Sequence, residues 1–459
     1  MKINRILCLC SIALVMSACN TPKVDKPVVF ETDVEVRIHR LSSSTQEDAP
    51  KYYDVNFHYS DAYFDNAATT FSKDLELLSY ASCMAGTKDT TKAFYNAMNF
   101  VDHEDYNYDI TGAHTIGYYF AHKEFKDYDL IAVSIRGLDY KQEWGNNVII
   151  GETGNHAGFD ESAETIYGSL KTYINDFDDK TIKLWVSGYS RAGGVANVLS
   201  SKLLKEKTDI KIEKENAFFY TFEAPAAVSI ENAVAYENVF NVLNELDFIP
   251  QIPPKEYGLF RCGKDVLIDN TNTQEKLNAL DQTIVLPEFT SLTYTDIKTS
   301  EKTEITSPEA LESLLFSILL KVPGENDEYL CMETRSDFVN NYQTHLSYLL
   351  ALFFSLPSET VTHIMTAAKA LSTWQMLSLL GDGGIYDFLA PILTQDNIDF
   401  KEEDLKPATE VIRTFITGHL DLLLMFVDMS TMSINQAAID DVMRIAYLHF
   451  PEVVYALIK

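Results

Sequence analysis

The chain has 459 residues, of which 46% are hydrophobic and 23% are charged, so it is long enough to bury at least one large core. Its 37 basic and 67 acidic residues give a formal net charge of −30. This acidic balance excludes binding to nucleic acid, or to an anionic membrane, through a basic patch.

The first residues have the order of an export signal. Lys2 and Arg5 precede an apolar run that is too short to span a bilayer. The run ends in "MSAC" (16–19), which resembles the lipobox of bacterial lipoproteins. This resemblance implies a signal peptide over residues 1–18 and lipidation of Cys19. The chain would then be an exported bacterial lipoprotein of the cell envelope, anchored to a membrane at Cys19.

Strands and helices alternate from residue 31 to residue 305, after a tether over residues 19–30 that contains two prolines. In chain order we predict a β-like stretch, helices over 70–86 and 90–100, strands at 116–125 and 130–137, a helix over 160–177, a strand at 182–188, a helix over 191–206, and strands at 217–225, 239–247 and 258–268. Helices of this length between strands imply crossovers on a mostly parallel sheet. The fold class predicted for residues 31–305 is therefore α/β.

The pattern changes to helices in residues 306–459, which we call the helical region. Apolar positions at helical spacing occur in five segments, 307–322, 336–355, 358–371, 406–429 and 433–450, and an acidic loop at 396–406 divides them. Asp421 and Asp428 interrupt the apolar run near residue 425, so we expect a buried helix there and no membrane span.

The remaining cysteines and acidic loops indicate no cofactor or metal. Cys83, Cys262 and Cys331 are an odd number without close spacing, which favours neither a disulfide framework nor a zinc site and leaves one bridge open. The segment "DYNYDITG" (105–112) spaces its acids like a calcium loop, but Ile110 stands where that loop requires glycine.

The segment "WVSGYSRAGG" (185–194) has the features of a nucleophile elbow. Such an elbow needs a strand that ends abruptly, a strained turn that raises a serine, and small neighbours that let strand and helix approach each other. Gly188 and Ala192 supply small residues on either side of Ser190. The alternative interpretation is a glycine-rich turn that serves only packing.

Four further segments stand around this serine in a recognisable order: "IAVSIRGLDYKQEW" (131–144), "GNHAGF" (154–159), "FYTFEAP" (219–225) and "NVLNELDFIPQIPP" (241–254). Together with the elbow they resemble the class 3 lipases, the branch of the α/β hydrolases that includes fungal lipases. The resemblance covers about residues 115–270. It implies an α/β-hydrolase fold with a mostly parallel central sheet, and hydrolysis of carboxylic esters.

The resemblance also implies roles for individual residues. Ser190 would be the nucleophile, and the backbone N–H groups of Arg191 and Leu138 would form the oxyanion hole. Leu138 stands where the family has threonine or serine, so it adds no hydroxyl to that hole. Asp247 matches the aspartate that orients the catalytic histidine. His156 matches a histidine that we interpret as structural support near the elbow.

Two histidines are candidates for the general base. His345 resembles the family's D-H segment, but Thr344 replaces the aspartate, and the surrounding pattern is a continuous helix. His449 stands just before Pro451, which is favoured in the first turn of a helix, and this is where α/β hydrolases place their base. We favour His449. If it is the base, the helical region leaves the core and returns to it, and would cap the active site.

The sequence thus predicts a serine hydrolase that cleaves lipid or small acyl esters through an acyl-enzyme, without a cofactor, a metal or a nucleic-acid partner. Two alternatives stay open. One is a non-catalytic cell-surface lipoprotein that uses the hydrolase fold for binding. It is considered because Leu138, Ala192 and Thr344 differ from the residues that the class 3 lipases have at these positions. The other is an esterase that removes acyl groups from polysaccharides. Acyl chain length, head group and oligomeric state are not determined by the sequence.

Overall fold

The computed structural model places strands and helices along most of the chain. It describes residues 29–41, 50–110, 112, 114–138, 140–175, 177, 180–207, 209–286, 289–296, 299–320, 332–419, 425, 427–428 and 433–459.

The described residues form a seven-stranded mixed sheet in the order β11-β9-β7-β6-β5-β4-β3. Its strands are β3 (Val101–Tyr106), β4 (Tyr118–Glu124), β5 (Tyr128–Ile135), β6 (Thr181–Tyr189), β7 (Ala217–Phe222), β9 (Val239–Leu243) and β11 (Lys264–Leu267). The five strands from β5 to β11 run parallel, and β4 and β3 continue the sheet in antiparallel pairing. Because parallel strands end at the same edge, the loops that follow β5, β6, β7 and β9 converge there.

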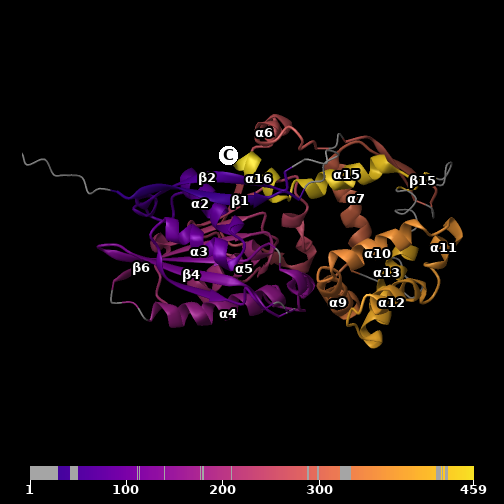
Figure 1. The fold of residues 1–459 in the computed structure, drawn as a ribbon, viewed down its shortest axis with the longest axis horizontal. Helices are drawn as coiled ribbons and strands as arrows, with labels where there is room; N and C mark the ends of the chain where they lie inside the picture. The colour runs from indigo at the N-terminus through magenta and orange to yellow at the C-terminus, as the bar shows by residue number, and fades with distance from the viewer. Residues whose placement is uncertain are drawn as a thin grey trace, which may run out of the picture.

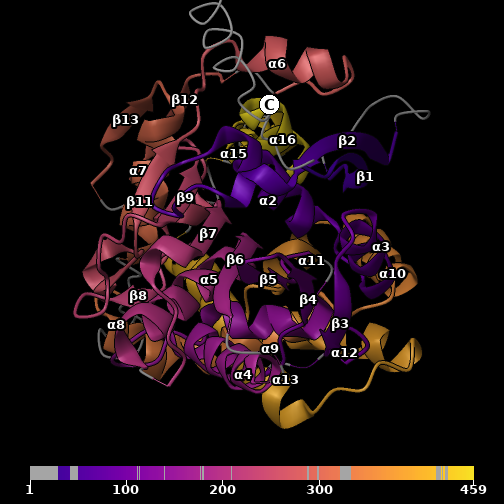
Figure 2. The same ribbon diagram turned by 90° about the vertical axis from the view of Figure 1, so that its left-hand side faces the viewer.

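Helices cover both faces of this sheet (Figure 2). On one face lie α4 (Ala157–Ile174) and α5 (Arg191–Ser201), which continues as the π-helical turn η3 (Lys202–Glu206). On the other face lie α2 (Lys73–Met84) and α16 (Pro451–Ile458). Two large cores therefore sandwich the sheet, which explains why its central strands are almost entirely apolar.

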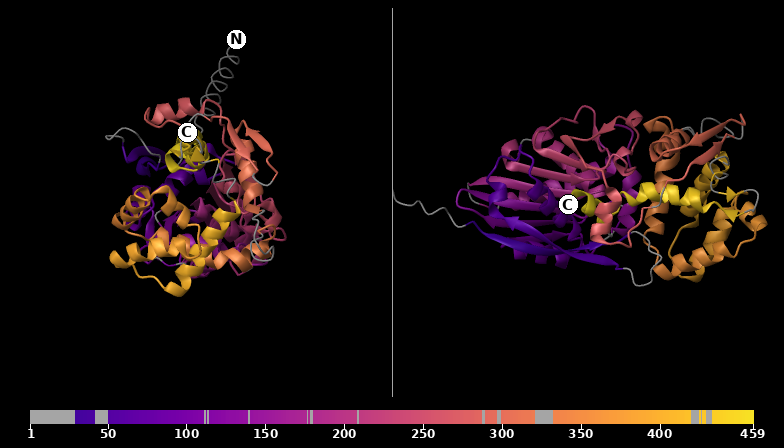
Figure 3. Two further views of the ribbon diagram at one scale, coloured as in Figure 1. Left: turned by 90° about the vertical axis from the view of Figure 1, so that its right-hand side faces the viewer. Right: turned by 90° about the horizontal axis from the view of Figure 1, so that it is seen from above.

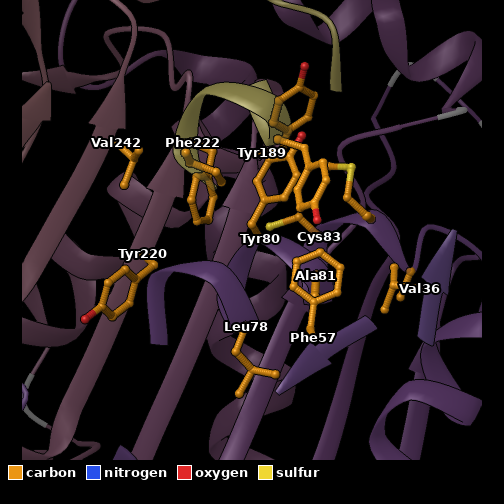
Figure 4. Close-up of a cluster of buried hydrophobic side chains, with 14 of the residues drawn as sticks. Val36, Phe57, Leu78, Tyr80, Ala81, Cys83, Tyr189, Tyr220, Phe222 and Val242 are labelled. Atoms are coloured by element: carbon orange, nitrogen blue, oxygen red, sulfur yellow. The ribbon is translucent and has the colours of Figure 1, made fainter. Parts of the chain in front are cut away.

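The N-terminal hairpin and α3 extend the second core. β1 (Glu31–His39) pairs antiparallel with β2 (Tyr52–Ser60), and its buried residues Val34, Val36 and Ile38 alternate with exposed ones. α3 (Lys88–Ala97) contacts β1 and begins at a capping box made by Thr87 and Thr90. Figure 4 shows how Val36 of β1, Tyr80 of α2 and Tyr189 of β6 gather in this core.

Short elements connect these larger ones. They are η1 (Asp61–Phe64), η2 (Lys141–Val148), η4 (Lys214–Asn216), η5 (Ile249–Gln251), η6 (Lys255–Tyr257), the strand pair β8 (Val228–Ser229) and β10 (Leu259–Phe260), α6 (Thr273–Leu280), and the hairpin β12 (Leu292–Thr295) with β13 (Lys302–Ile305).

The helical region lies beside the core and then returns to it (Figures 1 and 3). Its elements are α7 (Pro308–Leu320), α8 (Arg335–Phe338), the π-helical turn η7 (Val339–Gln343), α9 (Thr344–Phe353), α10 (Ser358–Lys369), α11 (Thr373–Ser378), α12 (Gly384–Gln395), α13 (Glu402–Gly418), the strand pair β14 (Val427–Asp428) and β15 (Ser433–Ile434), α15 (Gln436–Tyr447) and α16. α15 leads back from these helices, and α16 packs on the core beside α2. None of the helices among the described residues is long and apolar enough to cross a membrane.

One buried arginine joins the helical region to the core. The guanidinium of Arg335, at the start of α8, donates hydrogen bonds of 2.5–3.3 Å to five backbone carbonyl oxygens in the loop before α4. These oxygens belong to Ile150, Gly151, Thr153, Gly154 and Asn155. The side chain thus ties two segments of distant sequence together.

We predict that Arg335→Met lowers the free energy of unfolding by about 3 kcal/mol, because two buried and three partly buried hydrogen bonds lose their charged donor. Urea unfolding followed by circular dichroism measures the change. The matched control is Arg37→Met, because the Arg37 side chain is 50% exposed in its ion pair with Asp54 and its loss should cost no more than about 1 kcal/mol. Equal, small losses in both variants would contradict this role of Arg335.

The predicted fold class is confirmed: a mostly parallel sheet lies between helices and is followed by a large helical region. The single strand predicted at 258–268 is wrong. Gly263 has a φ of +86°, and a Cβ there would lie 2.2 Å from the Val239 carbonyl oxygen. The chain turns at this glycine, so β10 pairs with β8 while β11 joins the main sheet.

The boundaries around residue 402 also differ from the prediction. The acidic loop expected over 396–406 ends at Lys401, because Glu402, Glu403 and Asp404 form the first turn of α13. Acidic side chains are favourable there, since they face the positive end of the helix dipole. The helix expected to reach residue 429 ends at Gly418. Residues 427–428 instead form the strand β14, which pairs with β15.

Candidate active site

Ser190 occupies a strained turn between β6 and α5. Its φ of 55° and ψ of −125° are rarely adopted by a residue with a side chain. The turn is held by the Ser190 N–H, which donates to the Phe222 carbonyl at 2.8 Å, and by the Gly194 N–H, which donates to the Ser190 carbonyl at 3.1 Å. The hydroxyl therefore stands at the carboxyl edge of the sheet, at the start of a helix.

Close backbone contacts explain the small residues around this turn. A Cβ on Gly188 would lie 2.3 Å from the Ala192 carbonyl oxygen, and a Cβ on Gly137 would lie 2.3 Å from the Tyr189 carbonyl oxygen. The same Cβ on Gly137 would be 3.3 Å from the Ala192 methyl group. Ala192 is therefore accommodated beside the turn, because its methyl group faces a residue without a side chain.

His449 connects Ser190 to Asp247. Its Nε2 lies 2.8 Å from Ser190 Oγ, and its Nδ1 lies 2.5 Å from Asp247 Oδ2. Asp247 follows β9, and its Oδ1 accepts the Ile249 N–H at 2.9 Å. The Asp247 side chain is 1% exposed, whereas His449 is 17% exposed. The three groups form a continuous chain of hydrogen bonds that opens toward solvent at the serine end.

Two buried tyrosines hold the backbone that carries His449. This residue stands between α15 and α16, and Pro451 begins α16. The Tyr189 hydroxyl donates to the His449 carbonyl oxygen, and the Tyr80 hydroxyl donates to the Pro451 carbonyl oxygen at 2.5 Å. Burial raises the pKa of both phenols well above the ordinary value, so they remain donors at any physiological pH.

The second histidine candidate lies elsewhere. His345 is the second residue of α9, inside the continuous helix that runs from Arg335 to Phe353. The structure thus brings His449, and not His345, within hydrogen-bond distance of Ser190 and Asp247.

The two proposed oxyanion donors lie on neighbouring segments. Arg191 is the first residue of α5, where a backbone N–H has no acceptor within its own helix. Leu138 follows β5 and lines the same cleft as Ser190. No hydroxyl stands at position 138, so this segment offers only its backbone N–H to a substrate oxygen.

A buried ion-pair cluster joins these segments. The Glu143 carboxylate lies between the guanidinium groups of Arg136 and Arg191, at 2.8 Å from Arg191 Nη1. All three side chains are buried. Arg136 stands two residues before Leu138, and Arg191 adjoins Ser190. The cluster therefore fixes the loop after β5 against the start of α5.

A cleft of about 1110 Å³ opens at Ser190 and His449. β1, α3 and the end of α9 form its walls, and its apolar lining includes Val34, Val36, Met84, Phe94, Leu138, Trp144, Phe354 and Phe450. The helical region therefore contributes directly to the cleft through Phe354. η2 turns Trp144 toward α9, so its ring stacks between Tyr140 and Phe354, at centroid distances of 5.0 and 3.9 Å.

His156 is buried at the start of α4. Its Nδ1 accepts the Phe159 N–H at 3.4 Å, and its ring stacks on Phe159. Burial lowers its pKa to about 3, so the ring stays neutral and serves as a helix cap.

Several other predictions concern cysteines and metals. Cys19, together with the signal peptide over residues 1–18, lies outside the described residues, and its lipidation stays a prediction. Cys83 and Cys262 are buried free thiols, and Cys331 also lies outside the described part. Within the described ranges, no group of His, Cys, Asp or Glu side chains could hold a metal ion.

The fold and the Ser190–His449–Asp247 geometry define the class of protein: an α/β-hydrolase fold with a Ser–His–Asp arrangement at the carboxyl edge of its sheet. Residues 132–257 match the family model described as lipase (class 3). Comparison with curated proteins gave no match.

Solved structures similar to this chain include fungal lipases. The Rhizomucor miehei lipase propeptide complex is 16% identical with a TM-score of 0.33, covering 43% of this chain and 69% of that one. A triacylglycerol lipase whose catalytic centre is described as a serine protease triad is 20% identical with a TM-score of 0.34, covering 46% and 80%. Lipase II from Rhizopus niveus is 14% identical with a TM-score of 0.33, covering 44% and 83%.

Proposed function

We propose that this protein is a serine hydrolase that cleaves carboxylic esters of lipids or small acyl compounds through an acyl-enzyme. The observation that carries the proposal is the hydrogen-bonded chain from Ser190 Oγ through His449 to Asp247, with distances of 2.8 and 2.5 Å. The strained backbone of Ser190 and the match of residues 132–257 to the class 3 lipase model support it.

In the first half of the proposed reaction, His449 Nε2 takes the proton of Ser190 as Oγ attacks the ester carbonyl carbon. The backbone N–H groups of Leu138 and Arg191 stabilise the negative charge on the carbonyl oxygen. Asp247 stabilises the imidazolium, which then gives its proton to the leaving alcohol. In the second half, water loses a proton to His449 and attacks the acyl carbon. The bond from that carbon to Ser190 Oγ then breaks, the imidazolium returns its proton to Oγ, and the acid is released.

The cleft favours an acyl group over a strongly charged substrate. Its lining near Ser190 is largely apolar, and its acidic and arginine side chains lie along β1 and β2. An apolar chain gains about 0.8 kcal/mol for each methylene group that it buries. Rates on an ester panel of graded acyl length would locate the preferred chain.

We predict that an alkyl fluorophosphonate probe labels the purified protein covalently and that Ser190→Ala abolishes the labelling, because the probe reacts with an activated serine hydroxyl. The matched control is Ser187→Ala. This serine is three residues upstream in β6, and its buried hydroxyl donates to the Ser82 hydroxyl at 2.9 Å, away from His449. A folded protein that takes no label and hydrolyses no short p-nitrophenyl ester would contradict the proposal and favour a binding role for the fold.

A further inference from the structure

A long groove leads away from Ser190 between β1 and α3. Residues from the ranges 33–39 and 87–97 line the same cleft as Ser190 and His449, and α3 contacts β1. We call this part of the cleft the β1–α3 groove. Both of its walls precede residues 132–257, which match the class 3 lipase model, so the groove lies outside the matched segment.

One end of the groove lies at the catalytic groups. The N–H of Leu41, which follows β1, donates to Glu452 Oε1 at 3.1 Å, and Glu452 stands three residues after His449. The end of α2, which leads directly into α3, is bonded to β6, because the Ser187 hydroxyl donates to the Ser82 hydroxyl at 2.9 Å. The end of β1 and the start of α3 are therefore both held at the carboxyl edge of the sheet.

The other end of the groove is held by Lys123. Its Nζ donates to the carbonyl oxygen of Met98, directly after α3, at 2.8 Å, and to Asp61 Oδ1 at 2.6 Å. The Asp61 N–H donates at 3.0 Å to the carbonyl oxygen of Phe30, directly before β1. The end of α3 and the start of β1 therefore meet at Lys123, and the two walls run along each other in opposite chain directions.

The lengths of the two walls give the length of the groove. From His39 back to Asp33, β1 extends over about 20 Å at the rise of a strand. From Thr87 to Ala97, α3 extends over about 15 Å at the rise of a helix. An extended hydrocarbon chain advances about 1.3 Å per carbon atom. The groove therefore has the length of a chain of about 12 to 16 carbon atoms.

The floor of the groove is apolar. It is formed by Val34 and Val36 of β1, Met84 of α2 and Phe94 of α3, each at most 5% exposed. An apolar chain gains free energy when it is buried on such a surface, whereas the hydroxyl groups of a sugar would lose water there. The floor thus favours an acyl chain over a polysaccharide.

We propose that the β1–α3 groove binds the acyl chain of the ester and selects long chains, with the ester carbonyl at Ser190 and the methyl end of the chain beside Ala97. This inference rests on the proposed esterase function, because it names the acyl group that Ser190 would receive. Ala93 and Ala97 are exposed, line the cleft and stand four residues apart on one face of α3. Their small side chains leave the groove open, so these two positions limit the acyl length.

The first test measures binding without turnover. Isothermal titration of Ser190→Ala uses 1-O-alkyl glycerol ethers, which have no ester bond to cleave, below the concentration at which each forms micelles. From the octyl to the decyl to the dodecyl ether, the Kd should fall by up to about tenfold at each step, because two more methylene groups are buried. A Kd that does not depend on the alkyl length would overturn the proposal, whether or not the protein is an esterase.

The second test blocks the groove at two depths in the Ser190→Ala protein. Ala93 lies about 9 Å along α3 from Thr87, a depth of about eight carbon atoms. Ala93→Phe should therefore weaken binding of the dodecyl ether at least about tenfold and leave the octyl ether within about threefold. Ala97→Phe, nearer the far end, should leave the octyl and decyl ethers within about threefold and weaken only longer ones.

The matched control is Lys92→Phe. Lys92 is an exposed residue of the same helix that does not line the cleft, so this variant should bind every ether within about twofold of the parent protein. Circular dichroism confirms folding. If Ala93→Phe does not fold, Ala93→Leu replaces it and should weaken the dodecyl ether by a smaller factor than the phenylalanine would. Equal effects of Ala93→Phe and Lys92→Phe would overturn the proposal.

The third test measures kcat/KM for p-nitrophenyl esters from butanoate to hexadecanoate, with Ser190 intact. The natural protein should be fastest at about 12 to 16 carbon atoms, and Ala93→Phe should move this optimum to about eight while it leaves the butanoate rate within about threefold. A variant that is slower on all esters by the same factor would overturn the proposal. If the ethers bind as expected but the natural protein hydrolyses no ester, the proposed function fails while the binding site stands.

Discussion

His449→Ala is expected to lower kcat for a short p-nitrophenyl ester by on the order of a million-fold, as removal of the base does in a serine protease. The reason is geometric, since Nε2 of this ring is 2.8 Å from Ser190 Oγ and accepts its proton in the proposed reaction. Without the ring, Ser190 keeps its proton and reacts only as a neutral alcohol. The remaining rate would come from the oxyanion hole and from substrate binding.

The matched control for this prediction is His345→Ala. His345 lies in α9, so its removal should leave kcat within about threefold of the natural protein. Circular dichroism confirms that both variants are folded. The reverse pattern, with activity retained in His449→Ala and lost in His345→Ala, would contradict the site described above and would make the helical region a trailing domain.

The central sheet was predictable because each of its inner strands is buried on both faces. Segments such as residues 130–137 and 182–188 are therefore almost continuously apolar, and a sequence pattern of this kind indicates a parallel sheet. Helix starts were predictable for a local reason as well. Ser72, for example, accepts the Leu75 N–H and begins α2.

Strands at the margins of the fold were not predictable in the same way. β3, "VDHEDY" (101–106), is the last strand of the sheet and is largely exposed, so it carries no apolar pattern. The hairpin β12–β13 is short and half-exposed, and its pairing depends on contacts with α7 and α15 in a small separate core. Such elements depend on tertiary contacts that no local window of sequence contains.

The same distinction applies to the site. Ser190 stands in a local pattern, because the elbow is made of consecutive residues. The partner histidine does not, since 259 residues separate it from the serine. What favoured His449 in the sequence was Pro451, a local signal for the start of a helix, and the structure places that helix on the core.

The residues that surround the site were missed for a related reason. Val36 of β1 and Phe354 of the helical region line the same cleft although more than 300 residues separate them.

Asp247→Asn is expected to lower kcat by about 10⁴-fold at neutral pH without unfolding the protein, because it reverses the hydrogen bond to His449. Asp247 Oδ1 accepts the Ile249 N–H, and Oδ2 faces His449 Nδ1. An asparagine would keep its oxygen on that N–H and turn its NH₂ group toward Nδ1. The ring would then carry its proton on Nε2, where it cannot accept the proton of Ser190.

The matched control is Asp269→Asn. The Asp269 side chain is 65% exposed, so this variant should keep its kcat within about twofold of that of the natural protein. Steady-state kinetics on the same ester measures both variants. Because the Ser190 hydroxyl is intact, Asp247→Asn should still react with a fluorophosphonate, only far more slowly. If it kept more than about a tenth of the natural kcat, the orientation of His449 would have to come from the carbonyl contacts of Tyr189 and Tyr80, and Asp247 would have no essential part in the reaction.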